Sequence, residues 1–186
     1  MKNKKLVAIL LSCLVITLSS SLLAGVRADN PLISRSNASR FLSGGFASGS
    51  YSYINQDPGN GYYQVNCNGN SYCCFYAFAD SSAFTGSTGS KSLNINVQVD
   101  YTSSSGTGSH TIYLKFIDES TGQTLFSSTT SDWNVYTGLN DIHAYPTVTL
   151  TNGHYYELQV GPYVQTSGSQ TAQAIGTITQ ITVTWT

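Results

Sequence analysis

Three cysteines lie close together in the stretch from Gln64 to Asp80, which is also the most apolar part of the chain after its N-terminal leader. Asn and Gly tolerate positive φ at little cost, so the run Asn68-Gly69-Asn70-Ser71 predicts a hairpin tip. A five-residue tip places Cys67 opposite Cys73, within reach of a cross-strand disulfide. We therefore predict a Cys67–Cys73 disulfide. A Cys67–Cys74 bond is the alternative, and a bond between the neighbours Cys73 and Cys74 would be strained.

The preferred pairing leaves Cys74 as a free thiol. Side chains alternate between faces along a strand, so Cys74, Tyr76 and Phe78 share one apolar face. The thiol then has three interpretations: a buried inert side chain, which we favour, an intermolecular disulfide, or a reactive group. The sequence has no second cysteine pair and no histidine near these cysteines. We therefore expect neither a metal ion nor a cofactor.

Asp141 and His143 are the only acid–histidine pair close in sequence. On a strand they would share a face, where the carboxylate could orient the imidazole. A polar loop between strands is the interpretation that we favour. The chain has no Gly-x-Ser-x-Gly elbow, phosphate-binding loop, His-Glu-x-x-His motif or EF-hand run. We therefore predict that the protein is not an enzyme.

Aromatic side chains are the richest chemical resource of this sequence, with 13 tyrosines and 2 tryptophans. Their flat faces and polar tips suit sugar rings and protein surfaces. Trp133 stands among polar residues beside a Thr-Gly stretch, although it could also close the edge of a sheet. Trp185 alternates with Val183 and Ile181, so we assign it to the core. The predicted binding surface consists of Tyr51, Tyr53, Asp132, Trp133, Asn134 and Tyr136.

Residues 1–28 predict a secretory signal peptide, with lysines at the start, an apolar core over Leu6–Leu18, and small residues before a cleavage site after Ala28. The run ending at Cys13 resembles a lipobox, which makes lipidation a less favoured alternative. Removal of 28 of the 186 residues leaves 158, enough for one domain. We expect a secreted, extracellular protein of bacterial origin with no stable membrane span after leader removal.

The mature part carries four basic and nine acidic residues, a formal charge of −5. Such a balance argues against nucleic acid as a partner.

The mature chain predicts strands almost throughout. Residues 29–46 are rich in Ser, Asn and Gly and predict an irregular segment or a short pro-segment, so the domain proper is expected over 47–186. Lys91–Thr102 alternates apolar and polar side chains most clearly. Hairpins are predicted over His110–Thr130 and Thr147–Val160, and Ala174–Thr186 is a closing strand. Roughly eight to ten strands without a helix predict an all-β fold, a single antiparallel β-sandwich of jelly-roll or immunoglobulin-like type.

The segment Val148–Val160 resembles a hairpin common in secreted jelly-roll and immunoglobulin-like modules. In those modules a tyrosine after a turn glycine bonds back to the backbone, a part that Tyr155 or Tyr156 would play here. A three-residue loop would set Leu150 opposite Tyr156 and keep apolar residues together. This resemblance concerns the fold and implies no function.

These features favour a non-catalytic module that binds carbohydrate or a cell-envelope surface through exposed aromatics. A structural or self-associating protein of an extracellular matrix or coat is the first alternative, because of the low charge, the odd cysteine and the open strand edges. A secreted toxin or bacteriocin is the second, because Ser/Thr-rich alternating strands can rearrange into membrane hairpins.

Overall fold

The computed structural model describes residues 30–36, 41–54, 60–130 and 138–186, with the side chains of 51–54 and 130 left out. Ten strands form in these ranges: β1 (Ile33–Ser36), β2 (Leu42–Ile54), β3 (Tyr62–Asp80), β4 (Gly89–Gly106), β5 (Ser109–Asp118), β6 (Gln123–Thr130), β7 (Gly138–Ala144), β8 (Thr147–Leu150), β9 (Tyr156–Thr166) and β10 (Thr171–Trp185). Within the described ranges we find no helix with the length and apolar character needed to span a membrane. The predicted signal peptide and Cys13 lie outside these ranges.

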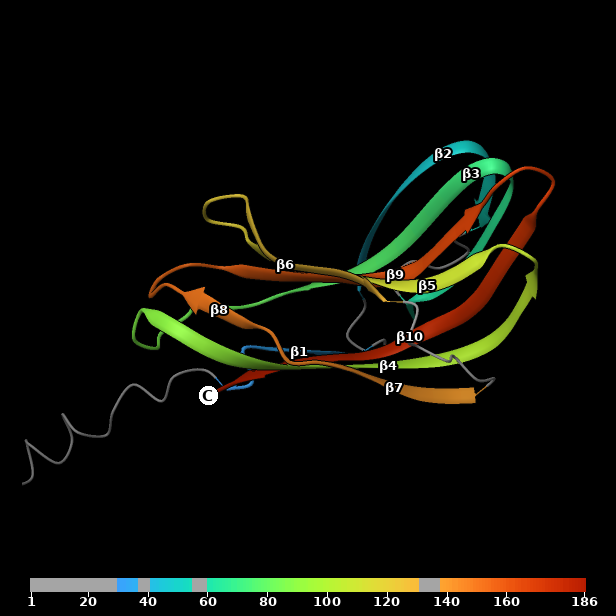
Figure 1. Ribbon diagram of the computed structural model, residues 1–186. Helices are drawn as coiled ribbons and strands as arrows, with labels where there is room; N and C mark the ends of the chain where they lie inside the picture. The colour runs from blue at the N-terminus through green and yellow to red at the C-terminus, as the bar shows by residue number, and fades with distance from the viewer. Residues whose placement is uncertain (1–29, 37–40, 55–59, 131–137) are drawn as a thin grey trace, which may run out of the picture.

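The strands form an antiparallel sheet in the order β6-β5-β9-β3-β10-β4-β7, with β1 on β10, β2 on β3 and β8 on β4. Figure 1 shows that the sheet curls into two layers. The layer drawn above contains β6, β5 and β9, and the layer below contains β1, β10, β4 and β7. The two layers join where β3 and β10 pair. The fold is therefore a single antiparallel β-sandwich, as predicted.

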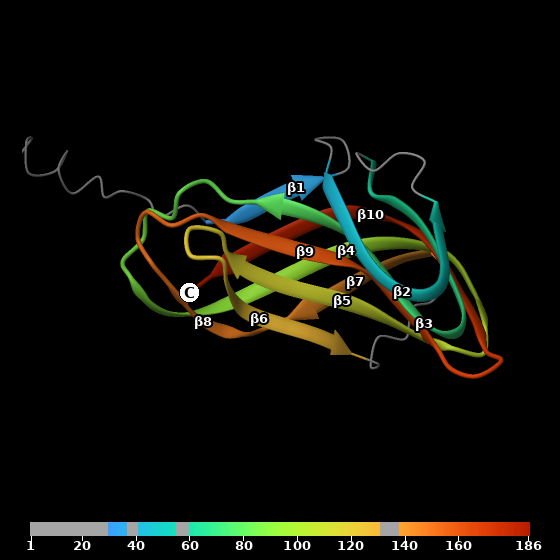
Figure 2. The same cartoon turned by 90° about the horizontal axis from the view of Figure 1, so that it is seen from above.

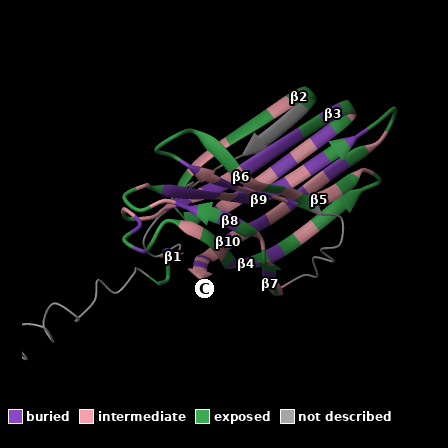
Figure 3. Cartoon of the chain, turned by 60° about the vertical axis from the view of Figure 1, so that its left-hand side comes forward, coloured by how far each residue is buried: buried purple, intermediate pink, exposed green. Residues whose placement is uncertain are grey.

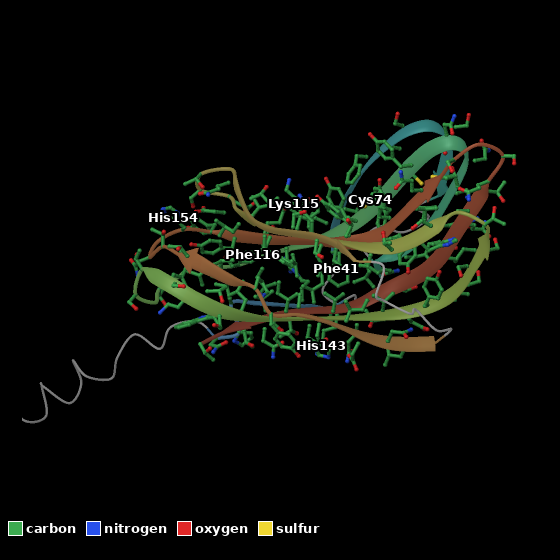
Figure 4. All side chains as sticks on the ribbon, in the orientation of Figure 1. Phe41, Cys74, Lys115, Phe116, His143 and His154 are labelled. Carbon is green, nitrogen blue, oxygen red and sulfur yellow. The ribbon has the colours of Figure 1, made fainter. Side chains whose placement is uncertain are left out.

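The core fills the space between the layers and follows the predicted alternation of side chains. Leu93, Ile95, Val97, Val99 and Tyr101 of β4 are all buried. Figure 3 shows the same alternation as buried and exposed bands along the long strands, and Figure 4 places Phe41 and Phe116 between the layers. Trp185 is only partly buried, but it packs edge-on against the buried Phe84, with ring centroids 5.3 Å apart.

The predicted cysteine hairpin is wrong, because its two arms belong to one folded strand. The N-terminal arm of β3 pairs with β10, and the C-terminal arm pairs with β9. The turn-forming residues Asn68–Ser71 make the bend, which a bond from the Ser71 hydroxyl to the Asn68 carbonyl closes at 2.7 Å. Gly49 passes alongside in β2 with φ +86°, and a Cβ there would lie 2.5 Å from the Asn70 carbonyl oxygen. The bend therefore carries β3 from one layer to the other.

The predicted Cys67–Cys73 disulfide is absent from the structure, in which all three cysteines are free thiols. The prediction of proximity is correct, since the two sulfur atoms lie 2.9 Å apart inside the bend. That distance exceeds the 2.05 Å of a covalent bond, and the Cys67 thiol donates a hydrogen bond to the Cys73 sulfur. Cys74 is buried on the opposite face of the strand, in agreement with the buried interpretation that we favoured.

The predicted hairpin over Thr147–Val160 is also wrong in its pairing. β8 pairs with β4, whereas β9 pairs with β3 and β5, so the chain crosses between layers in this turn. The predicted back-bonding tyrosine is Tyr156, whose buried hydroxyl accepts a 2.7 Å hydrogen bond from the Thr151 amide. This bond holds the turn without any pairing of the two strands.

Within the range 29–46, the described residues 30–36 and 41–46 are more regular than their composition predicts. Ile33–Ser36 forms β1 against the C-terminal half of β10, and β2 begins at Leu42. Burial of Leu32, Ile33 and Phe41 in the core gives this polar segment its apolar anchors. Cleavage of the chain after Ala28 stays a prediction.

Candidate functional site

The sequence-predicted binding surface falls almost entirely outside the described residues. Asp132, Trp133, Asn134 and Tyr136 lie in the range 131–137. The backbones of Tyr51 and Tyr53 belong to β2, where they pair with Cys67 and Val65, but their side chains are not described. The structure therefore does not test whether these side chains lie together, and the predicted surface stays a prediction.

A different set of aromatic side chains gathers on the outer face of the layer formed by β2, β3, β9 and β5. These strands alternate, so their inward residues fill the core while their outward residues project from the sheet. Cross-strand pairing sets Phe46 and Tyr163 on either side of Cys74, and Figure 4 shows Cys74 and Lys115 on this outer side of the layer. We call the rings of Phe46, Tyr72, Tyr76, Tyr113 and Tyr163 the aromatic face.

Phe46 is the centre of the aromatic face. Its ring centroid lies 5.3 Å from Tyr113, 6.2 Å from Tyr163, 6.3 Å from Tyr72 and 6.5 Å from Tyr76. Tyr72 and Tyr163 stack on each other at 6.1 Å. Phe46 is 38% exposed and Tyr72 is 37% exposed, so solvent reaches rings that are already held by one another. Such preorganised rings can receive a ligand with little further loss of side-chain freedom.

The hydroxyls of Tyr76 and Tyr113 in the aromatic face are partly buried near Glu157. Burial, with smaller contributions from the charges of Cys74, Tyr76 and Glu157, raises the pKa of Tyr113 to about 12. Burial and the Glu157 charge likewise raise the pKa of Tyr76. Both phenols are therefore neutral at ordinary pH, where they can donate as well as accept hydrogen bonds.

Three carboxylates meet at one end of this layer. Asp80 is the last residue of β3, its pairing partner Glu157 is the second residue of β9, and Glu119 follows β5. One oxygen of each lies within 4.8 Å of the others. Burial is the largest cause of the raised pKa of all three carboxyl groups. Repulsion by the neighbouring acids raises the pKa of Glu119 and of Glu157 further.

Glu157 accepts a 2.6 Å hydrogen bond from Gln159, while the buried Oδ1 atom of Asp80 has no partner among the described residues. These are the residues that could hold a cation or share a proton. The spacing of Asp80, Glu119 and Glu157 in the sequence gives no sign of this grouping.

The histidines do not add a catalytic constellation to the aromatic face. His154 Nδ1 lies 2.8 Å from Oδ2 of the buried Asp118, whose Oδ1 accepts the Ser120 amide. This pair ties the turn after β5 to the turn before β9, at the end of the molecule labelled in Figure 4. Asp141 and His143 occur on β7 of the other layer, where the His143 ring stacks on Tyr145. They lie on a strand and not in the loop that we favoured.

No family model and no curated protein matches this chain. Among solved structures, it is similar to a carbohydrate-binding module of Cellvibrio mixtus lichenase 5A in complex with cellotriose, with 14% identity, 84% of this chain and 98% of the other covered, and a TM-score of 0.35. A module named TmCBM61, in complex with β-1,4-galactotriose, gives 14% identity, coverages of 80% and 92%, and a TM-score of 0.37.

The C-terminal module of the Zobellia galactanivorans laminarinase LamC gives 16% identity, coverages of 81% and 97%, and a TM-score of 0.36. Likenesses this distant assign no ligand to the present chain.

Proposed function

We propose that this protein is a secreted, non-catalytic module that binds carbohydrate on its aromatic face. The observation that carries the proposal is the grouping of five aromatic rings on the outer side of one layer. The centroids of the four tyrosine rings lie 5.3–6.5 Å from that of Phe46, and Tyr72 and Tyr163 also stack on each other. Soluble proteins seldom expose clustered apolar side chains unless the patch has a function.

Sugar rings suit this surface because they combine apolar C–H faces with a rim of hydroxyls. The C–H faces pack on aromatic rings, and the four tyrosine hydroxyls can exchange hydrogen bonds with the rim. Gln159 and Lys115, paired with each other on β9 and β5, add polar groups beside the rings. The aromatic face thus offers both kinds of contact without needing a nucleophile or an acid–base pair.

The test is affinity electrophoresis through gels that contain soluble polysaccharides of several linkages. The double variant Phe46→Ala, Tyr72→Ala removes the two most exposed rings of the aromatic face. We expect its binding to fall at least ten-fold, which corresponds to about 1.4 kcal/mol. The matched control is Tyr145→Ala, Tyr155→Ala, because these rings are 69% and 50% exposed and stand outside the aromatic face. Unchanged retardation of the Phe46/Tyr72 variant would refute the proposal.

Self-association through the same surface is the second candidate. Leu42, on the same strand as Phe46, is 54% exposed and extends the apolar area. Sedimentation velocity over a wide concentration range separates the two functions. A dimer that the Phe46→Ala, Tyr72→Ala variant abolishes would favour self-association, whereas a monomer that is retarded by polysaccharide would favour carbohydrate binding.

A further inference from the structure

We propose that the ligand of the aromatic face is a single, disordered glycan chain and not the flat surface of a crystalline polysaccharide. This inference rests on the proposed carbohydrate binding and specifies its substrate class. The geometry that carries it is the mutual tilt of the five rings.

The rings of the aromatic face do not share a plane. The Phe46 ring is inclined by 61° to Tyr72, by 44° to Tyr76, by 74° to Tyr113 and by 44° to Tyr163. Only Tyr72 and Tyr163 come close to parallel, at 22°. A crystal face is planar, so rings that stack on it must be coplanar. With these angles, Phe46 and its neighbours cannot lie flat against one plane together.

The strands beneath the rings do not form a flat support. β3 and β2 curve away from the flatter part of the layer toward their shared bend, as Figure 1 and Figure 2 show. Phe46 and Tyr72 stand on the curved strands, whereas Tyr113 stands on β5.

A separate glycan chain can match tilted rings because its glycosidic bonds rotate. Successive sugars can then turn their faces toward successive rings, and their hydroxyls remain free to bond with the tyrosine hydroxyls. In a crystal face, the sugar hydroxyls are already hydrogen-bonded to neighbouring chains, so the sugars cannot reorient. The tilt of the five rings therefore favours a glycan chain whose glycosidic bonds can rotate.

The experiment compares ordered and disordered forms of one polymer. Microcrystalline and acid-swollen cellulose, crystalline and colloidal chitin, and granular and gelatinised starch are the three pairs. Depletion isotherms give the amount bound, corrected for accessible area. We expect at least ten-fold more binding to the disordered form of whichever polymer is bound, with soluble oligosaccharide as a competitor. Phe46→Ala should abolish this binding, Phe46→Tyr should retain it, and Tyr145→Ala should leave it unchanged.

Equal binding to both forms, or preference for the crystalline form, would overturn this inference while leaving carbohydrate binding intact. Absence of binding to all six materials and to the soluble polysaccharides would instead refute the proposed function, and this inference with it. Urea unfolding of each variant shows whether lost binding reflects lost folding.

Discussion

The ring of Tyr76 lies directly across the backbone of Gly44 on the neighbouring strand. A Cβ at position 44 would stand 2.7 Å from the ring carbon and hydroxyl oxygen of Tyr76. The absence of a side chain at Gly44 therefore sets where this tyrosine of the aromatic face can rest.

Gly44→Ala should displace Tyr76 and weaken glycan binding several-fold, because the ring cannot occupy its present place beside a methyl group. We expect a stability cost of about 1 kcal/mol from the crowding. Affinity electrophoresis and urea unfolding measure the two effects. Ser50→Ala, an exposed substitution on the same strand, should change neither. Undiminished binding by Gly44→Ala would show that the position of Tyr76 does not matter to the ligand.

Tyr156→Phe should destabilise the protein by about 1 kcal/mol, because it leaves the part-buried Thr151 amide without its phenol acceptor. The neighbouring Tyr155 is half exposed, so Tyr155→Phe is a control with the same chemical change. The midpoints of urea unfolding compare the two variants. Equal midpoints would mean that water replaces the lost hydroxyl.

The three carboxylates predict that stability falls as pH rises. Asp80, Glu119 and Glu157 have raised pKa values, so the folded state holds their protons more tightly than the unfolded state does. Their destabilising effect is absent below the ordinary carboxyl pKa of about 4 and is complete above the raised values.

Asp80→Asn should therefore gain stability relative to the wild type with increasing pH, and should lose that advantage at low pH. Urea unfolding across a pH series gives the difference. A difference that does not depend on pH would contradict the grouping of these carboxylates. Asp141→Asn, on an exposed site of the other layer, is the control.

All three cysteines should resist alkylation in the native protein and react fully once it unfolds. Burial raises the pKa of the Cys73 and Cys74 thiols, and all three side chains are almost inaccessible. Intact mass of the protein without residues 1–28, which contain Cys13, should show three modifications after iodoacetamide treatment in urea without reductant. A single modification would mean that two of the cysteines are covalently paired.

The alternation of side chains predicts most of the strands, because it depends only on which residues face the core. It places Leu93 through Tyr101 correctly and puts Cys74, Tyr76 and Phe78 on one face. The pairing of the strands was less predictable than their positions in the sequence. Asn68–Ser71 has the residues of a hairpin tip, but a bend between layers needs the same positive-φ residues. Only the distant strands β9 and β10 decide between the two.

The aromatic face was missed for a related reason. Tyr113 and Tyr163 each alternate with buried residues, which marks them as outward-facing. Nothing in the local pattern shows that β5 and β9 lie beside each other and beside β3. The carboxylate group has the same origin, since its members are brought together only by the register of these strands.

The place of β10 has a consequence for how the chain reaches its native state. The last strand in chain order lies between β3 and β4 and also carries β1 on its far half. Until it arrives, two long apolar strands have unpaired edges that can recruit other chains. The pairing of β10 with β3 joins residues far apart in sequence, such as Thr177 and Tyr62, and such long-range pairing is slow. A chain in which β10 has not yet docked is consequently the form most prone to aggregate.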